Sequence, residues 1–187
     1  MDSPLPFAAI EKDFRESLGY VRDDIEALVN GQTKPNYTVA LLVGCGCEML
    51  AAAYNKRKHP EEILAELLPP GDWRVLSKRL YTALRDGLAH GFDTKHLDVD
   101  GEVIQIIIAW LDGDLIDLAR VSPWGLAVWI SVLTLAKDLC AKITAFENDL
   151  KGDEVLRRQF KRSCEHQQMT TLDTREKQAW ERLVAAL

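Results

Sequence analysis

The feature that most constrains the fold is a stripe of apolar residues that recurs at spacings of three and four from the start of the chain. In residues 7–29 this period places the apolar side chains on one face of an α-helix. The stripe consists of Phe7, Ile10, Phe14, Leu18, Val21, Ile25 and Leu28. It stops at "NGQTKPN", where Gly31 and Pro35 are typical of a helix end and a turn. Residues 37–58 are apolar on most sides and are predicted to form the central buried helix.

A similar pattern of helices and breaks continues as far as residue 91. Pro60 and the "PPG" at 69–71 bound a short third helix, "EEILAELL". Asp72 is predicted to be the N-cap of a fourth helix that ends near Gly91. The apolar period then changes from helix to strand. Residues 97–99 and 103–110 are predicted to form a β-hairpin that turns at Asp100-Gly101.

The remaining sequence favours helices. Ser122-Pro123 predicts the start of a long helix that reaches about Leu150, and Gly152 predicts its end. A basic helix follows to about residue 168, and Asp173 with Glu176 matches a capping box for a terminal helix. Short loops between long helices indicate antiparallel neighbours. We therefore expect one all-α domain over residues 1–187, an antiparallel bundle with a small β-hairpin at about 97–110 and a helical extension from about 153.

Composition limits the class of protein. The 187 residues are 47% hydrophobic and 28% charged, which is ordinary for a soluble globular protein. The longest apolar candidate for a membrane span, residues 124–139, is too short and is interrupted by polar residues. The N-terminus has no basic region typical of a secretory signal, and the four cysteines have no disulfide or zinc spacing. These observations predict free thiols and a cytoplasmic protein. The net charge of −6 argues against broad wrapping of nucleic acid and leaves room for a local basic pocket.

The stretch "LRDGLAHGF", residues 84–92, ends the predicted fourth helix with residue types that a purely core-filling helix would not favour. Arg85 presents a planar fork of donors that fits a phosphate, and the charge of this fork persists at any working pH. An imidazole such as that of His90 can take a proton from a ribose 2′-OH or give one to the leaving oxygen. The pair fits RNA cleavage without a metal. The plain alternative is a solvated surface arginine and a histidine that stabilises the helix C-terminus.

Helix geometry sets a condition on this pair. Five residues turn a straight helix by about 500°, so Arg85 and His90 point about 140° apart. They converge if the last turn loosens at Gly87 and Gly91, or if a second subunit supplies part of the site. A two-fold dimer that pairs this helix with its own copy would place two arginines and two histidines in one cleft.

Residues 85–90, "RDGLAH", resemble the Arg-polar-x3-His signature of the HEPN superfamily, and residues 37–91 look like its two-helix core. The resemblance implies a small helical bundle that acts as a homodimeric, metal-independent endoribonuclease in toxin–antitoxin or phage-defence systems. It implies that Arg85 and His90 are catalytic and that Asp86 orients them. Many members are non-catalytic, so the resemblance also implies the alternative of a module that binds a partner protein or a nucleotide. The predicted hairpin and basic helix lie outside the minimal bundle of the family.

Three further residues are candidates for substrate binding. Tyr81 and Lys78 precede Arg85 by one and two helical turns on the same side, and His96 follows the motif. Each has a plain alternative as a surface or hairpin-entry residue. The sequence contains no phosphate-cradling glycine loop, nucleophile elbow or zinc spacing, so no cofactor or metal is expected. The expected partners are RNA, a second copy of the chain and an antitoxin or other partner protein, but no membrane. A third reading is a structural dimer in which the motif is accidental.

Overall fold

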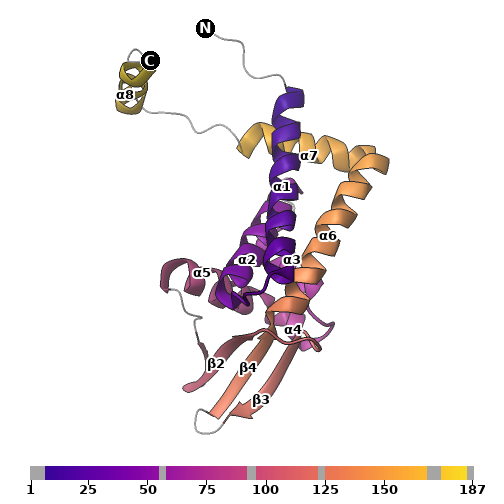
Figure 1. The fold of residues 1–187 in the computed structure, drawn as a ribbon, viewed down its shortest axis with the longest axis vertical. Coiled ribbons are helices and arrows are strands. Elements are labelled where there is room, and N and C mark those ends of the chain that lie inside the picture. Colours follow the sequence, from indigo (N-terminus) through magenta and orange to yellow (C-terminus); the bar gives the residue numbers. More distant parts are fainter. Residues whose placement is uncertain (1–6, 55–57, 92–95, 122–124, 168–173, 185–187) are drawn as a thin grey trace.

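The fold is a helical layer joined to a four-stranded mixed sheet (Figure 1). The structure is a computed structural model, and it describes residues 7–54, 58–91, 96–121, 125–167 and 174–184. This architecture is mixed α/β, so the expectation of an all-α bundle with a small hairpin is wrong. The helices are largely where the sequence predicts them, and the error lies in the strands.

The helical layer is built around α2, Asn36–Ala53. It contacts α1 (Phe7–Asn30), α3 (Pro60–Leu67), α5 (Ser77–Gly91) and α6 (Val132–Gly152). The predicted central helix is therefore confirmed, although it ends at Ala53 and not at residue 58. The length and composition of α2 would also allow it to cross a membrane, but half of that stretch is buried among the other helices. α2 is therefore a core helix of this fold. The segment that the sequence offered as the nearest membrane candidate, residues 124–139, instead includes a whole strand, Gly125–Ser131, and the start of α6.

The predicted fourth helix is two helices. A single-turn helix, α4 (Asp72–Val75), precedes α5, and Leu76 separates them. Gly71, at φ +101°, is the N-cap of α4, and no side chain caps this end, so the prediction of Asp72 as the cap is wrong. Arg74 Nε donates to the Leu68 carbonyl at 3.1 Å, and this bond ties α4 back to the end of α3. Leu76, between the two helices, is 38% exposed.

The predicted hairpin is confirmed as β1 (Leu97–Val99) and β2 (Glu102–Ala109), which pair antiparallel. Asp100 and Gly101 both have positive φ, at 52° and 85°, as a tight two-residue hairpin turn requires. The Asp98 carboxylate accepts a hydrogen bond from the Gly101 amide at 2.8 Å. The hairpin is not a small insertion, because β2 continues into a larger sheet.

Two strands were not predicted. β3 (Ile116–Val121) pairs antiparallel with β4 (Gly125–Ser131), and β4 pairs parallel with β2, which gives the sheet order β1-β2-β4-β3. The sequence assigned residues 125–131 to the start of a long helix; Ser122 and Pro123 lie outside the described residues. β4 is a central strand with a continuous apolar run, "LAVWIS", and such a run does not alternate, so its period does not distinguish it from a buried helix.

The strand-to-helix junction explains where α6 begins. Ser131 is the last residue of β4 and the N-cap of α6, and its hydroxyl accepts from the Thr134 amide at 3.2 Å. The same hydroxyl donates to the Leu111 carbonyl at 2.6 Å. The inner face of the sheet, with Ile106, Ile108 and Ile130 buried, packs under α2 and α6.

The C-terminal elements are α7 (Glu154–Gln167) and α8 (Thr174–Val184). α7 is the predicted basic helix, and it closes the end of the helical layer that is opposite to the sheet (Figure 1). Phe160 of α7 packs against Phe14 and Phe146. The predicted cap of the terminal helix, Asp173, lies outside the described residues. α8 is drawn apart from the other helices, and its Trp180 is 60% exposed.

Candidate functional site

The candidate site starts from the close approach of α5 to α2. A Cβ atom on Gly44 of α2 would lie 3.2 Å from Cγ of Arg85, so the glycine makes room for the arginine stem. A Cβ on Gly46 would lie 2.6 Å from Leu139 Cδ2 of α6. The two glycines thus allow α2 to approach a different helix on each side, which offsets their cost in helix propensity. This approach brings the side chain of Arg85 against α2.

Glu48 of α2 receives two side chains of α5. Arg85 Nε donates to Glu48 Oε1 at 2.8 Å, and the Tyr81 hydroxyl donates to the same oxygen at 2.9 Å. The side chains of Arg85 and Glu48 are 30% and 39% exposed, so the pair lies at the surface and water screens its charges in part. Tyr81 is half-buried beside it. The structure therefore brings two of the predicted site residues together through a carboxylate that was not predicted.

The electrostatics of this cluster keep Arg85 and Tyr81 as donors. The hydrogen bond to Glu48 raises the pKa of the Arg85 guanidinium above its usual value. Burial, followed by the hydrogen bond and charge of Glu48, raises the pKa of the Tyr81 hydroxyl well above that of a free tyrosine. Burial and the charge of Glu48 also raise the pKa of the nearby Cys45 thiol, which opposes its use as a nucleophile. The cluster is built to hold a guanidinium in place.

The second half of the predicted motif is not brought to Arg85 by the fold of one chain. α5 remains helical through Gly91, so its last turn does not loosen at Gly87 as convergence within one chain would require. Position 90 therefore stays about 140° around the helix axis from position 85. The side chain of His90 lies outside the described residues. Asp86 is half-buried on α5, next to Arg85 in sequence.

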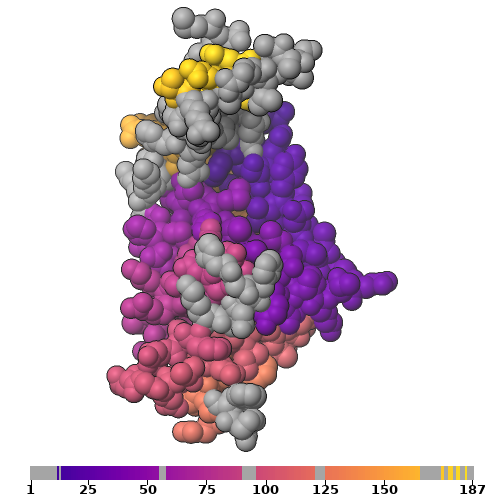
Figure 2. Space-filling model, turned by 90° about the vertical axis from the view of Figure 1, so that its left-hand side faces the viewer, coloured from indigo at the N-terminus to yellow at the C-terminus, as the bar shows by residue number. Residues whose placement is uncertain are grey.

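Within the described residues, neither of the other two candidates makes a hydrogen bond to Glu48. Lys78 is exposed on α5. His96 is exposed at the entry to β1, where it lines a groove between α5 and β1 together with Arg79. The face of the molecule in Figure 2 shows the α5 and hairpin region at the surface, between the N-terminal helices and the outer strands. Arg85 and Tyr81 thus meet at Glu48, and Lys78 lies on the same side of α5, about 20° around the helix from Arg85. His96 lies in the groove between α5 and β1.

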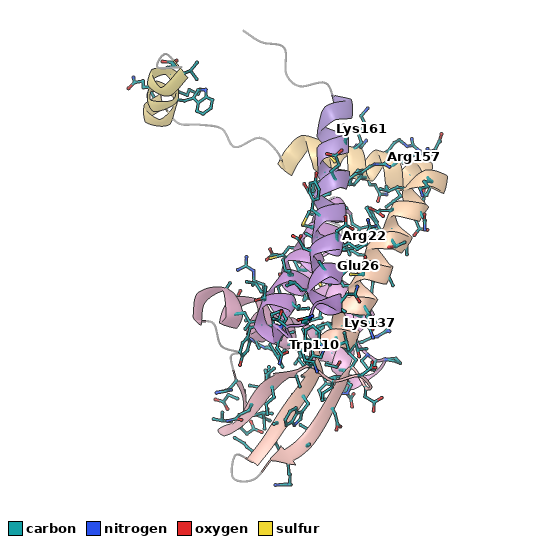
Figure 3. All side chains as sticks on the ribbon, viewed as in Figure 1. Arg22, Glu26, Trp110, Lys137, Arg157 and Lys161 are labelled. Carbon is teal, nitrogen blue, oxygen red and sulfur yellow. The ribbon has the colours of Figure 1, made fainter. Side chains whose placement is uncertain are left out.

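The basic helix is remote from both locations. Arg157 and Lys161 project from α7 at the end of the helical layer that is farthest from the sheet (Figure 3). They do not add to the charge around Arg85. The prediction that the cysteines form no disulfide is confirmed for Cys45, Cys47, Cys140 and Cys164, which all lie in the described part of the chain.

Sequence reasoning missed Glu48 and Arg79. A signal for Glu48 was present, because it is the single charged residue in the apolar run "VALLVGCGCEMLAAAY". A lone carboxylate in a central helix needs a partner, and Arg85 is the partner it finds. Arg79 had no such signal, because only the position of β1 makes it part of a groove.

Comparison of the chain with models of protein families, with curated proteins and with solved structures found no match.

Proposed function

We propose that this protein is a metal-independent endoribonuclease that acts as a homodimer in the cytoplasm, in a toxin–antitoxin or phage-defence setting. Arg85 binds the scissile phosphate, His90 is the general acid and base, and Asp86 orients them. The ribose 2′-oxygen attacks the adjacent phosphorus as its proton leaves. The bond from phosphorus to the 5′-oxygen then breaks as that oxygen gains a proton. The products are a 2′,3′-cyclic phosphate and a 5′-hydroxyl.

The observation that carries this proposal is the way Glu48 holds Arg85. The hydrogen bond to Glu48 uses Nε, and among the described residues the four N–H groups on the two Nη atoms are left for an anion. The side chain is 30% exposed, which gives a ligand access to it. Because the guanidinium is fixed before binding, little rotamer freedom is lost when it binds a phosphate bidentately. A carboxylate that neutralised the whole guanidinium would oppose this role, but a single bond at Nε leaves the fork available.

Because α5 is unbroken, positions 85 and 90 of one chain point apart, and the proposed site needs a second subunit. Position 85 faces the flank of α5 next to α2, and position 90 faces the other flank. A two-fold axis beside this helix would place Arg85 of one copy against His90 of the other. The site is incomplete without that partner copy.

The test is to incubate the purified protein with single-stranded RNA in excess EDTA and to analyse the ends of the products. We expect cleavage that leaves 2′,3′-cyclic phosphates, and a loss of at least about a hundredfold in both Arg85→Ala and His90→Ala. Arg85→Lys should recover only part of the activity, because an ammonium does not offer the bidentate fork. Intact RNA at high wild-type concentration, or cleavage that survives both substitutions, would refute the enzyme.

A second candidate function is a non-catalytic module that binds a nucleotide or a partner protein through the same face. The observation that favours it is the pairing of Arg85 with Glu48 on the side of α5 away from position 90. In that case a nucleoside monophosphate should bind the wild type, and binding should weaken in Arg85→Ala but not in His90→Ala. Calorimetric titration of the three proteins separates this function from the nuclease.

A further inference from the structure

A groove of about 470 Å³ runs between α5 and β1, within the size range of ligand sites. It is lined by Leu76, Arg79, Thr82 and Ala83 on one side and by His96, Leu97, Asp98 and Val99 on the other. Arg79 and Ala83 lie about 120° and 160° around the helix from Arg85, and Thr82 lies between them and Arg85. Glu48, Tyr81 and Arg85 are not among the residues that line the groove. The groove is therefore separate from the Arg85 cluster.

The guanidinium of Arg79 is the positive charge that α5 contributes to this groove. Arg79 is exposed, and within the described part of the chain no hydrogen bond or ion pair of its guanidinium is recorded. Asp98, the acidic residue of the groove, already accepts the Gly101 amide in the hairpin turn. His96 adds an exposed imidazole on the opposite wall. Arg79 and His96 thus offer hydrogen-bond donors to a ligand on both sides of the groove.

The same groove has an exposed apolar wall. Leu76 and Val99 are 38% and 54% exposed, although large apolar side chains in a small domain are mostly buried. Leu76 is exposed because the helix is interrupted between α4 and α5. Val99 is exposed because β1 is an edge strand. An apolar surface beside an unpaired guanidinium suits a ligand that has a flat apolar face and a phosphate. A nucleotide has both.

The position of the groove along α5 connects it to the reaction. Arg79 and position 90 are eleven residues apart, so they lie about 20° from each other around the helix and about 16 Å apart along it. The groove and position 90 are therefore on one stripe of α5. That separation is too large for both to reach the same phosphate, so a strand that passes position 90 would meet Arg79 at another phosphate.

We propose that the α5–β1 groove binds a nucleotide of the RNA strand that flanks the cleaved bond, with Arg79 on its phosphate and Leu76 and Val99 against its base. This inference rests on the proposed function, since it names where the substrate of that reaction lies. It assigns to Arg79 a role in substrate binding that the motif does not contain.

The experiment measures RNA binding apart from cleavage. A fluorescein-labelled single-stranded RNA of eight nucleotides is titrated with His90→Ala protein, alone and combined with Arg79→Ala, at several salt concentrations. We expect Arg79→Ala to weaken binding about five- to tenfold and to lower the slope of log affinity against log salt by about 0.7, the loss of one phosphate contact on a single strand. Arg157→Ala on α7 is the matched control, because it removes the same charge far from the groove.

Two further experiments distinguish RNA from a free nucleotide or phosphate as the ligand, and separate failure of the groove proposal from failure of the nuclease proposal. In the first, adenosine monophosphate or inorganic phosphate replaces RNA. If the protein binds either of them tightly, loses that binding in Arg79→Ala and does not bind RNA, the groove is not an RNA subsite. Wild-type and Arg79→Ala proteins are compared for cleavage in the other, where KM should rise with kcat unchanged. If Arg79→Ala and Arg157→Ala bind RNA with equal affinity, the proposal that the groove binds RNA is wrong, and the nuclease proposal is unaffected. Arg79-dependent RNA binding without cleavage overturns the nuclease and supports the groove.

Discussion

Glu48 Oε1 accepts hydrogen bonds from both Tyr81 and Arg85, and this sharing decides how the arginine is presented. A carboxylate that bonds Nε fixes the plane of the guanidinium, and the tyrosine prevents the carboxylate from rotating away. Since these side chains are partly exposed, their net effect on stability is small, while their effect on orientation is large. Glu48 is thus a positioning residue for Arg85.

We predict that Glu48→Ala lowers RNA cleavage at least about tenfold while lowering the free energy of unfolding by no more than about 1 kcal/mol. The same substitution should lower the pKa of Tyr81 toward its ordinary value, because the hydrogen bond and charge of Glu48 are lost and only burial remains. Cleavage kinetics, urea unfolding and the difference absorbance of tyrosinate measure these three effects.

Glu16→Ala is the matched control, because Glu16 forms an exposed ion pair with Lys12 at 3.6 Å within α1. It should change neither cleavage nor the titration of Tyr81. If Glu48→Ala cleaves RNA as well as this control does, Glu48 does not position Arg85.

Burial of Cys47 predicts a loss of stability in alkali. Burial raises the pKa of its thiol from about 9 to about 12. A raised pKa in the folded state means that the unfolded chain loses this proton first, so stability is intact below about pH 9 and falls as the pH rises toward 12. Relative to Cys47→Ala, the wild type should lose about 1.4 kcal/mol of unfolding free energy per pH unit in this window. Urea unfolding of both proteins at pH 8, 9 and 10 measures it, and parallel curves would show that Cys47 ionises as easily folded as unfolded.

At the residue scale, the sequence predicted those site residues whose role follows from their own side-chain chemistry. Arg85 and Tyr81 were predicted to share a surface, and they do, at Glu48. Glu48 and Arg79 were not predicted as site residues, because their roles depend on which element packs beside them. The register of α2 against α5 and the position of β1 are not encoded in local spacing.

At the scale of elements, the paired glycines of α2 set its distances to α5 and α6. Gly44 faces the stem of Arg85, and Gly46 faces the fully buried Leu139. The side chain of Arg85 can shift toward solvent, whereas Leu139 is enclosed. Helix–helix distance is therefore more tightly constrained at Gly46.

We predict opposite outcomes for alanine at these two glycines. Gly46→Ala should destabilise the protein by about 1–2 kcal/mol, since overpacking against Leu139 exceeds the gain of up to about 1 kcal/mol in helix propensity. Gly44→Ala should leave stability within about 0.5 kcal/mol but reduce cleavage, because its Cβ displaces the stem of Arg85. Thermal unfolding and the RNA assay measure both. Equal destabilisation by the two variants would contradict the difference in their surroundings.

The boundaries of the helices were predictable where a strong local signal exists, as for α1 and for the end of α6 at Gly152. The start of α6 was not, because a central β-strand precedes it without a turn. The Ser131 hydroxyl caps the helix there, but a serine inside an apolar run gives no warning that the backbone changes from strand to helix. Non-local pairing with β2 and β3 decides the strand.

At the scale of the whole molecule, the sheet changes what the helical layer presents. β1 lies beside α5 and forms one wall of a groove on the flank that carries position 90, while α2 covers the flank that carries Arg85. A bundle without the sheet would leave the first flank open. The mixed architecture therefore supplies one wall of the proposed RNA-binding groove, and α5 lies between the two halves of the proposed site.

The central claim is that each active site takes Arg85 from one copy and His90 from the other. Arg85→Ala and His90→Ala chains, with different affinity tags, are co-expressed and purified through both tags to isolate the mixed dimer. One of its two sites then holds an intact Arg85 and an intact His90, so we predict about half of the wild-type cleavage rate per dimer, although each parent variant is inactive. A mixed dimer as inactive as its parents would contradict the shared site.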